Sequence, residues 1–284
     1  MTVKQLITKK RVKATTFQSV IILLAVIFLL LAFIPIILMF ILSLKSNVQI
    51  YGNFWSLPNP IQWSNYNKAI GMLIPNMINT IVVVTIATMI AVILSANAGY
   101  VFAKLDFPGK NVLFMAIISL MMVPGVLTLT PQFSLMQTYK IYNTWLALIL
   151  PWVSGGQVFG IILCRTFISG LPTEILESAR MDGCSELRAL FKIVFPLSKP
   201  ILATVAIMKM MDYYNDFIWP LMVIESNKKQ VITVAIRVFQ SATGSLDMGS
   251  MVAGFVFATI PMLILFIFTS RLYIEGITSG AVKG

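Results

Sequence analysis

This chain of 284 residues contains no histidine, only two cysteines and few charged residues. Without histidine, imidazole acid–base catalysis and the usual zinc sites are excluded. Cys164 and Cys184 are too few to build a metal cage, and we expect them to be reduced, small packing residues. Charged residues make up 11% of the chain, against about 25% in soluble domains. Together with a hydrophobic content of 58%, this scarcity of charge indicates an integral membrane protein.

The nucleotide-binding pattern G-x-x-x-x-G-K-[ST] is also absent, so the chain offers no such loop to cradle a phosphate. The net charge of +11 is spread between apolar runs, which favours a topology signal over nucleic-acid binding. At the N-terminus a basic start precedes an apolar run that is too long for the core of a signal peptide. We therefore interpret this run as an uncleaved first span.

Six apolar runs are long enough to cross a bilayer, for which about 20 apolar residues are needed. They cover Phe17–Leu44, Asn76–Lys104, Val112–Gln137, Asn143–Phe167, Pro200–Ile224 and Met251–Tyr273. Pro and Gly interrupt several runs, which is tolerated where neighbouring helices satisfy the freed backbone groups. The sequence therefore predicts an all-α membrane protein with six transmembrane helices.

The Lys and Arg residues also predict the orientation of the chain. A cytosolic N-terminus places most of them in cytosolic segments, so both termini are predicted to lie in the cytosol. The aromatic, Pro-rich stretch 51–67 favours the external membrane–water boundary. The predicted segments are a basic tail (1–16), a first helix (17–44), an external interfacial segment (45–75), a five-helix core (76–275) and a cytosolic tail (276–284).

The most polar block, residues 171–199, lies between the fourth and fifth spans on the predicted cytosolic side. Pro172 favours a helix start, and Asp182-Gly183 favours a sharp turn. The spacing of Leu187, Leu190 and Phe191 predicts an apolar stripe on a second helix. These patterns are equally compatible with a docking surface for a soluble partner and with an amphipathic helix that rests on the membrane.

Within this block, Glu177-Ser-Ala-Arg-Met-Asp182-Gly183, with Pro196 downstream, resembles the EAA loop of bacterial ABC importer permeases. Ser178 stands where the family pattern has Ala. Three further segments are similar to the carbohydrate-importing branch, and the last of them to maltose-permease G-type subunits: 100–110, 215–221 and 273–284. The resemblance extends from about residue 53 to residue 284, with Tyr214 where the branch usually has Trp.

The resemblance implies one half of the translocation pore of an ATP-driven importer in the bacterial cytoplasmic membrane, working by alternating access. It implies four kinds of partner: a homologous second permease, two copies of a cytosolic ATP-binding subunit that binds ATP and Mg, an extracytoplasmic solute-binding protein and the lipid bilayer. It implies no cofactor, metal, catalytic residue or nucleic-acid partner for this chain. A sugar or oligosaccharide is the implied cargo, with a glycerol phosphate ester or an amino acid as alternatives. A membrane enzyme and an autonomous channel remain the competing classes.

The resemblance also implies roles for particular residues. The ATPase-coupling residues are those of the polar block: Glu177, Ala179, Asp182, Gly183, Leu187, Phe191 and Pro196. Glu177 is expected to pair with a basic residue of the ATPase, and the C-terminal tail is expected to reach the ATPase through Gly280 and Lys283. The Gly- and Ser-rich segment 240–249, expected to be a loop, is assigned the contact with the binding protein through Gln240, Thr243, Gly244 and Ser245.

The fifth span carries charges at positions that share one helix face, namely Lys209, Asp212 and Asp216. Charges within a span usually face a bundle interior or an aqueous cavity. One interpretation is a structural ion pair between Lys209 and Asp212. The other is a polar lining of the substrate pathway, to which Tyr213, Tyr214 and Asn215 contribute, because aromatic faces and amides suit a sugar.

Overall fold

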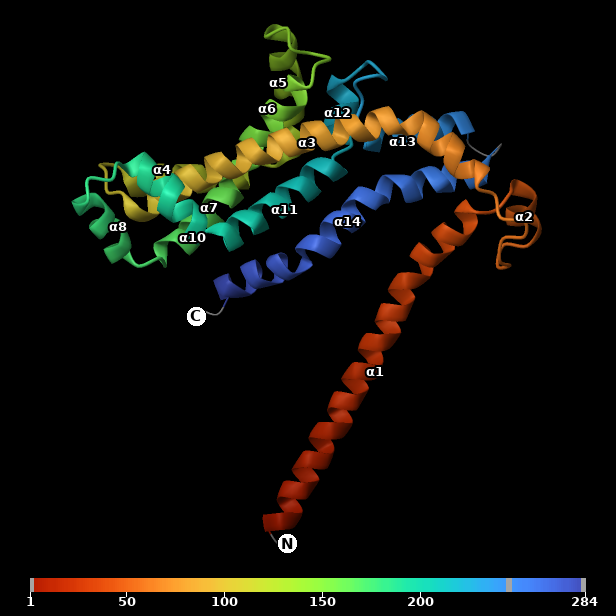
Figure 1. The fold of residues 1–284 in the computed structure, drawn as a ribbon, viewed down its shortest axis with the longest axis horizontal. Coiled ribbons are helices and arrows are strands. Elements are labelled where there is room, and N and C mark those ends of the chain that lie inside the picture. The colour runs from red at the N-terminus through yellow and green to blue at the C-terminus, as the bar shows by residue number, and fades with distance from the viewer. Residues whose placement is uncertain (1–2, 244–246, 282–284) are drawn as a thin grey trace. The chain divides into compact units, whose positions relative to one another are not determined.

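The computed structural model describes residues 3–243 and 247–281, with side chains described for residues 18–243 and 247–270. Within these ranges the regular structure is entirely helical, which confirms the predicted all-α class (Figure 1). The chain divides into two compact units. Unit 1 comprises residues 1–71 and 240–257, and unit 2 comprises residues 72–239 and 258–284.

The longest helices are α1 (Val3–Ser43), α3 (Ser64–Lys104) and α14 (Met248–Ala281). The shorter elements that precede the polar block are α2 (Asn47–Gly52), α4 (Lys110–Ser119), the 3-10 turn η1 (Leu120–Met122), α5 (Gly125–Thr138), α6 (Leu146–Gly155) and α7 (Gln157–Ser169). Those within and after it are α8 (Thr173–Met181), α9 (Glu186–Ala189), the π-helix η2 (Leu190–Val194), α10 (Phe195–Leu197), α11 (Lys199–Asn215), α12 (Ile218–Val223) and α13 (Ile232–Thr243).

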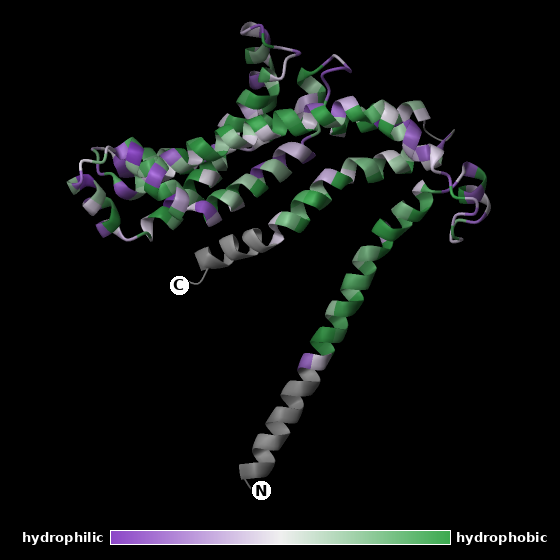
Figure 2. Ribbon diagram, viewed as in Figure 1, coloured by the Kyte–Doolittle hydropathy of each residue, from purple (hydrophilic) through white to green (hydrophobic). Residues whose placement is uncertain are grey.

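Among the described residues, three helical stretches are long and apolar enough to cross a membrane unbroken: Gln18–Ser43, Ser64–Lys104 and Met248–Ser270. Three pairs of consecutive helices pass the same test only as bent spans. Figure 2 shows the corresponding bands of hydrophobic residues along α1 and α3, and hydrophilic residues around α8. The structure is therefore compatible with as many as six crossings, the number that the sequence predicts.

The bends lie where the backbone cannot continue a regular helix. The α4–η1 segment meets α5 at 98°, with Pro124 between them. The α6 and α7 helices meet at 47° at Gly155 and Gly156. The segment from Glu186 to Leu197 meets α11 at 82°. The third and fourth spans, predicted from the sequence as single runs, are thus each made of two helices.

The fifth span also differs from its prediction as one run to Ile224. The α11 helix ends at Asn215, and Asp216 adopts an extended conformation before α12 begins. The reason is Pro220, whose ring clashes with the carbonyl of Asp216 in a continuous helix and which donates no hydrogen bond to it. The hydroxyl of Thr233 donates to that freed carbonyl instead, at 2.7 Å.

Two other helices extend beyond their predicted spans. The α3 helix begins at Ser64, so it includes the last part of the segment predicted to lie along the external interface. The α14 helix runs from Met248 to Ala281, so most of the predicted C-terminal tail is helical. The predicted span limits marked only the most apolar part of each helix.

In unit 1, a buried lysine organises the segment after α1. The ammonium group of Lys45 donates to the carbonyls of Asn53 and Phe54 at 3.0 and 2.9 Å, and to the hydroxyl of Ser56 at 3.2 Å. This arrangement fixes a loop from which Trp55 projects into solvent. The interfacial position of this segment stays a prediction.

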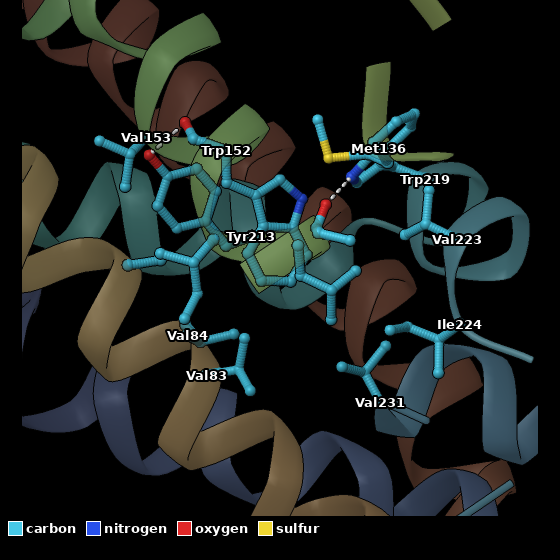
Figure 3. Packing of buried hydrophobic residues seen from close by; sticks show 14 of the residues in the cluster. Val83, Val84, Met136, Trp152, Val153, Tyr213, Trp219, Val223, Ile224 and Val231 are labelled. Carbon is cyan, nitrogen blue, oxygen red and sulfur yellow. Dashed lines mark hydrogen bonds between the residues drawn. The ribbon is translucent and has the colours of Figure 1, made fainter. Parts of the chain in front are cut away.

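In unit 2, α7 and α11 lie side by side, and a buried apolar cluster joins α3, α6, α11, α12 and α13 (Figures 1 and 3). In Figure 3, Trp152 and Tyr213 lie against each other, with Val83 and Val84 of α3 next to them. A second cluster packs the polar block against α3, α7 and α11. These two clusters position the two candidate sites.

Candidate functional site

The polar block folds as the predicted helix, turn and second helix. Gly183 has a φ of +75°, in the left-handed region that side chains with a Cβ rarely adopt. The N–H of Cys184 donates to the carbonyl of Ala179 at 2.9 Å, and the N–H of Gly183 donates to that of Arg180 at 3.0 Å. These two bonds form a Schellman motif, which satisfies the last carbonyls of α8. The prediction of a sharp turn at Asp182-Gly183 is confirmed.

A polar network ties this turn to the end of α3. Tyr100 donates a hydrogen bond to Glu186, and the Arg180 guanidinium donates to the other oxygen of the same carboxylate at 2.7 Å. The hydrogen bond from Arg180, followed by that from Tyr100, holds the pKa of Glu186 below its ordinary value. Glu186 in turn raises the pKa of Arg180. Because Tyr100 precedes Glu186 by 86 positions, no local sequence pattern predicts this link.

The start of α8 is held as well. The ammonium group of Lys104, the last residue of α3, donates to the carbonyl of Leu171 at 2.7 Å and to the hydroxyl of Thr173 at 3.2 Å. The start of α8 is therefore bonded directly to the last turn of α3, and its end is linked to Tyr100 of α3 through Glu186. A displacement of α8 relative to this helix end breaks several hydrogen bonds, so the two elements are expected to move together.

The predicted apolar stripe of the second helix is wrong in register. Leu190 is 3% exposed and packs with Tyr100, whereas Leu187 and Phe191 are 69% and 52% exposed. The stripe was drawn for an α-helix, but Leu190–Val194 form a π-helix, whose wider turn changes which residues share a face. Leu187 and Phe191 are left on the outside of the loop.

The exposed side of the block combines carboxylates with large apolar side chains. We call the following exposed residues the loop surface: Glu177, Met181, Asp182, Leu187 and Phe191. Among the described side chains, Glu177 has no hydrogen-bond or ion-pair partner. Of the other predicted coupling residues, Ala179 is half-buried and Pro196 is exposed. The loop surface offers an unpaired negative charge next to exposed apolar side chains. Its backbone is held in place by the hydrogen bonds of Lys104 and of the Tyr100–Glu186–Arg180 network.

The second candidate site is a cleft of about 760 Å³ in unit 2. It lies where helices are broken: at the start of α5, at the junction of α6 and α7, and between α11 and α12. Its lining includes Thr128, Gln132, Trp152, Gly156, Lys209, Asp212, Tyr213, Asn215, Asp216 and Trp219. A volume of this size falls within the range of about 300–1,000 Å³ typical of small-molecule sites.

Charged groups of the cleft differ in their exposure. The side chain of Lys209 is 7% exposed, and its ammonium nitrogen lies 3.8 Å from a carboxylate oxygen of Asp212, whose side chain is 67% exposed. Gly156 lies close to this lysine: a Cβ there would meet the ammonium nitrogen at 2.9 Å and the Tyr213 hydroxyl at 3.1 Å. The predicted ion pair and the predicted polar lining are therefore the same residues, with Asp212 as the accessible partner.

Aromatic rings form the other wall of the cleft. The rings of Trp152 and Tyr213 are stacked, with centroids 5.3 Å apart and planes 6° apart, and the hydroxyl of Tyr213 donates to the carbonyl of Trp152 at 2.8 Å (Figure 3). The indole N–H of Trp152 donates to the carboxylate of Asp216 at 2.6 Å. The other oxygen of Asp216 accepts from the backbone N–H of Trp219 at 3.3 Å, near the start of α12. This network fixes the aromatic wall.

Five of the six residues predicted for a substrate pathway line this cleft, and Tyr214 does not. Its hydroxyl donates to the carbonyl of Ala258 at 2.6 Å, and its side chain is buried. Tyr214 lies instead on the side of α11 that packs against α14, where Ala258 is located. The sequence analysis missed Trp152 and Trp219, although the neighbouring Gly155-Gly156 and Pro220 marked both helix breaks.

The remaining predicted contacts fall near the ends of the described ranges. Gln240 and Thr243 belong to the last turn of α13, and α14 begins at Met248, so the predicted loop 240–249 is shorter than expected. Gly244 and Ser245 lie outside the described residues. Gly280 is part of α14, whereas Lys283 lies outside the described residues. Within the described part of the chain, no group of three or more His, Cys, Asp or Glu side chains is placed to hold a metal ion.

Comparison with known proteins gives one family. Residues 95–274 match the model of the binding-protein-dependent transport system inner membrane component, a region that spans both candidate sites. The trehalose transport system permease protein SugB of Mycobacterium tuberculosis is 33% identical over 259 residues, covering 89% of this chain and 93% of SugB. The arabinooligosaccharides transport system permease protein AraQ of Halalkalibacterium halodurans is 34% identical over 206 residues, covering 72% of this chain and 73% of AraQ.

The fold is likewise similar to a solved structure. A chain of a bacterial ABC transporter involved in the import of the acidic polysaccharide alginate superposes with a TM-score of 0.80. The alignment covers 90% of this chain and 96% of that chain, at 24% sequence identity. The arrangement of unbroken and bent helices is thus one that an importer subunit adopts.

Proposed function

Because this chain belongs to the family of binding-protein-dependent transport system inner membrane components, we propose that it is a permease subunit of an ATP-driven sugar importer. The observation that carries the proposal is the braced loop surface, which offers a fixed contact to a soluble partner. The sequence has no Walker-type loop, so the energy for transport comes from that partner. The chain itself is a non-catalytic transport component.

Sugar is the proposed cargo on the strength of the relatives. Three proteins with 30–33% identity over most of this chain are a trehalose permease, a melibiose/raffinose/stachyose permease and a putative ABC transporter permease without a named cargo. A fourth, 34% identical over a shorter region, is an arabinooligosaccharide permease. The named cargos are di- and oligosaccharides. This range supports a small neutral sugar rather than a glycerol phosphate ester or an amino acid.

The loop surface is proposed to be seated in a cleft of a cytosolic ATPase. Glu177 then pairs with a basic group there, while Leu187 and Phe191 lose their exposure to water. Closure of the ATPase displaces the loop, and the bonds of Lys104 and of the Tyr100–Glu186–Arg180 network carry the displacement to α3. The spans then change between two global states by rigid-body rotation, the alternating-access mechanism that the resemblance implies.

This mechanism requires a defined topology and several partners. We propose six spans with both termini in the cytosol, in the cytoplasmic membrane of a bacterium. A related permease completes the pore, two ATP-binding subunits bind ATP and Mg, and an extracytoplasmic binding protein delivers the sugar. The solved alginate importer with a bound periplasmic protein supports such a partner through its fold. The turn around Gln240 and Thr243 is proposed to contact the binding protein, and the segment with Gly280 and Lys283 the ATPase.

The test is reconstitution. The chain is co-expressed with its companion permease, ATPase and binding protein, and the purified complex is placed in proteoliposomes. ATP-dependent uptake of radiolabelled trehalose, raffinose or arabinotriose is the expected result. Recovery of the chain without any ATPase, or a complex that hydrolyses ATP but takes up none of these sugars, contradicts the proposal.

A further inference from the structure

The cleft exposes an ionised side chain at the level of a predicted membrane span. Asp212 belongs to α11, and its carboxylate faces the cleft with two thirds of its surface uncovered. A charge that faces lipid is costly, so such residues face water or another protein. The ammonium group of Lys209 compensates the charge from one side only, because it is buried behind Asp212. The mouth of this cleft therefore faces water or the second permease rather than lipid.

The chemistry of the cleft matches a carbohydrate. A carboxylate accepts two hydrogen bonds from neighbouring hydroxyls, and Asn215 adds an amide beside it. Trp152 and Tyr213 are more than 90% buried, so they present only ring edges to the cleft, against which the C–H groups of a sugar can pack. Their positions are fixed by their mutual stacking and by the bonds to Asp216, so no ordering is required when a ligand enters.

The charges also decide which kind of carbohydrate fits. Two carboxylates, Asp212 and Asp216, line the cleft against one ammonium group, that of Lys209. The ammonium group is nearly inaccessible, whereas the carboxylate of Asp212 is open. An anionic sugar that enters meets the like charge of Asp212 first, without a cation within its reach.

We propose that this cleft is a sugar subsite formed by this subunit itself, and that Asp212 makes it selective for neutral over uronate-bearing oligosaccharides. The inference rests on the proposed function and goes further, because that function does not require this subunit to contact the sugar itself. It assigns direct substrate contact to Asp212, Asn215 and the edges of Trp152 and Tyr213.

A cysteine-protection experiment in the complete complex tests the subsite. Val126 lines the cleft and is exposed, while its neighbour Leu127 is equally exposed and does not line it. Val126→Cys is therefore the reporter and Leu127→Cys its matched control. Both variants also carry Cys184→Ser, which removes the partly exposed native thiol, whereas Cys164 is fully buried and is retained. The rate of modification by a small methanethiosulfonate reagent is measured with trehalose, raffinose or arabinotriose, and with trigalacturonate. Uptake of each sugar is measured in the same proteoliposomes.

The expected result is at least 5-fold slower modification of Val126→Cys with a transported neutral sugar, and an unchanged rate with trigalacturonate. Leu127→Cys is expected to react at one rate throughout. Asp212→Asn, added to the reporter, should raise the half-protecting sugar concentration at least 5-fold, while Asp106→Asn, an exposed carboxylate outside the cleft, should not change it.

The outcomes separate the two proposals. Uptake of a neutral sugar without protection of Val126→Cys overturns the subsite and leaves the importer standing. Equal protection by trigalacturonate overturns the charge selectivity. A complex that takes up none of the neutral sugars contradicts the proposed function, and the subsite falls with it.

Discussion

The loop surface and the cleft both belong to unit 2, but they use a broken helix in opposite ways. At the loop, the break after α8 is closed by the Schellman motif at Gly183, and Tyr100, Arg180 and Glu186 brace it. At the cleft, the helix breaks leave space between the elements, and the charged side chains turn into it. The first region is built as a rigid contact, and the second as an open site.

The distribution of polar groups follows the same difference. In the loop, Leu176 and Leu190 are buried, whereas the unpaired carboxylate of Glu177 lies outside beside exposed apolar side chains, which suits a protein partner. In the cleft the ammonium group of Lys209 is beneath and the carboxylate of Asp212 faces the space, which suits a small hydroxylated ligand. Substitutions in the loop should therefore change coupling to the ATPase, and substitutions in the cleft should change sugar affinity.

The largest expected effect is that of Glu177→Lys. Reversing the charge of a partly buried ion pair leaves two like charges in contact, and breaking such a pair costs about 3–5 kcal/mol, or roughly 100-fold or more in affinity. We expect membrane insertion to be unchanged and both ATPase retention and ATP-driven uptake to be lost. Glu174→Lys, on the first turn of the same helix, is the control, with uptake close to that of the wild type. Normal uptake by Glu177→Lys removes the docking role from the loop.

Gly183→Val is expected to have the next largest effect. A β-branched residue resists the φ of +75° that the turn requires, at a cost of about 1–2 kcal/mol or more. We expect the amount of copurified ATPase to fall about tenfold, as measured by quantitative gel densitometry. Gly183→Asn should retain most of it, because Asn tolerates the left-handed region. Equal retention by both variants shows that the turn geometry is not needed for docking.

Parts of both regions were open to prediction from the sequence. The turn at Asp182-Gly183 and the approach of Lys209 to Asp212 depend on neighbours along the chain, where residue type and helical spacing decide the outcome. The all-α class followed from the length of the apolar runs, because a run of about 20 apolar residues crosses a bilayer as a helix.

Other parts depend on contacts between distant segments. The bond from Tyr100 to Glu186 joins α3 to α9, and no local pattern announces it. Leu190 is buried and Leu187 is exposed because Leu190–Val194 form a π-helix. In this conformation Leu190 packs in one cluster with Tyr100 and Val194. Pro124 marked a break, but the 98° angle between the flanking helices is set by the packing around them.

A third prediction concerns the aromatic wall of the cleft. Asp216→Ala removes the acceptors of the Trp219 backbone N–H and of the Trp152 indole N–H. A buried donor left without its partner costs about 1–3 kcal/mol, so the detergent-purified complex should show a lower Tm and weaker sugar binding, with ATPase retention unchanged. Asp216→Asn keeps an acceptor and should lie between this variant and the wild type. A loss of ATPase retention in Asp216→Ala contradicts the separation of the two regions.

The smallest expected effect is the pH dependence of the loop. The folded pKa of Glu186 is lowered, so its ionised carboxylate stabilises the loop at every pH above its ordinary pKa of about 4.3. This stabilisation is lost as the pH falls through the lowered value. Because the side chains of Glu186 and Arg180 are more than a third exposed, we expect about 1 kcal/mol or less. Tm should fall less for Glu186→Gln than for the wild type between pH 6 and pH 3.5, and parallel curves contradict the network.

The proposed function depends most on the contact between the loop surface and a cytosolic ATPase, and site-specific photocrosslinking tests this contact most directly. Met181 is an exposed member of the loop surface, so a benzoylphenylalanine placed there, in the complete complex in its native membrane, reports what lies against it. The predicted result is a covalent product that contains the ATP-binding subunit. Crosslinks to lipid alone, or to the extracytoplasmic binding protein, would contradict the coupling role of the loop.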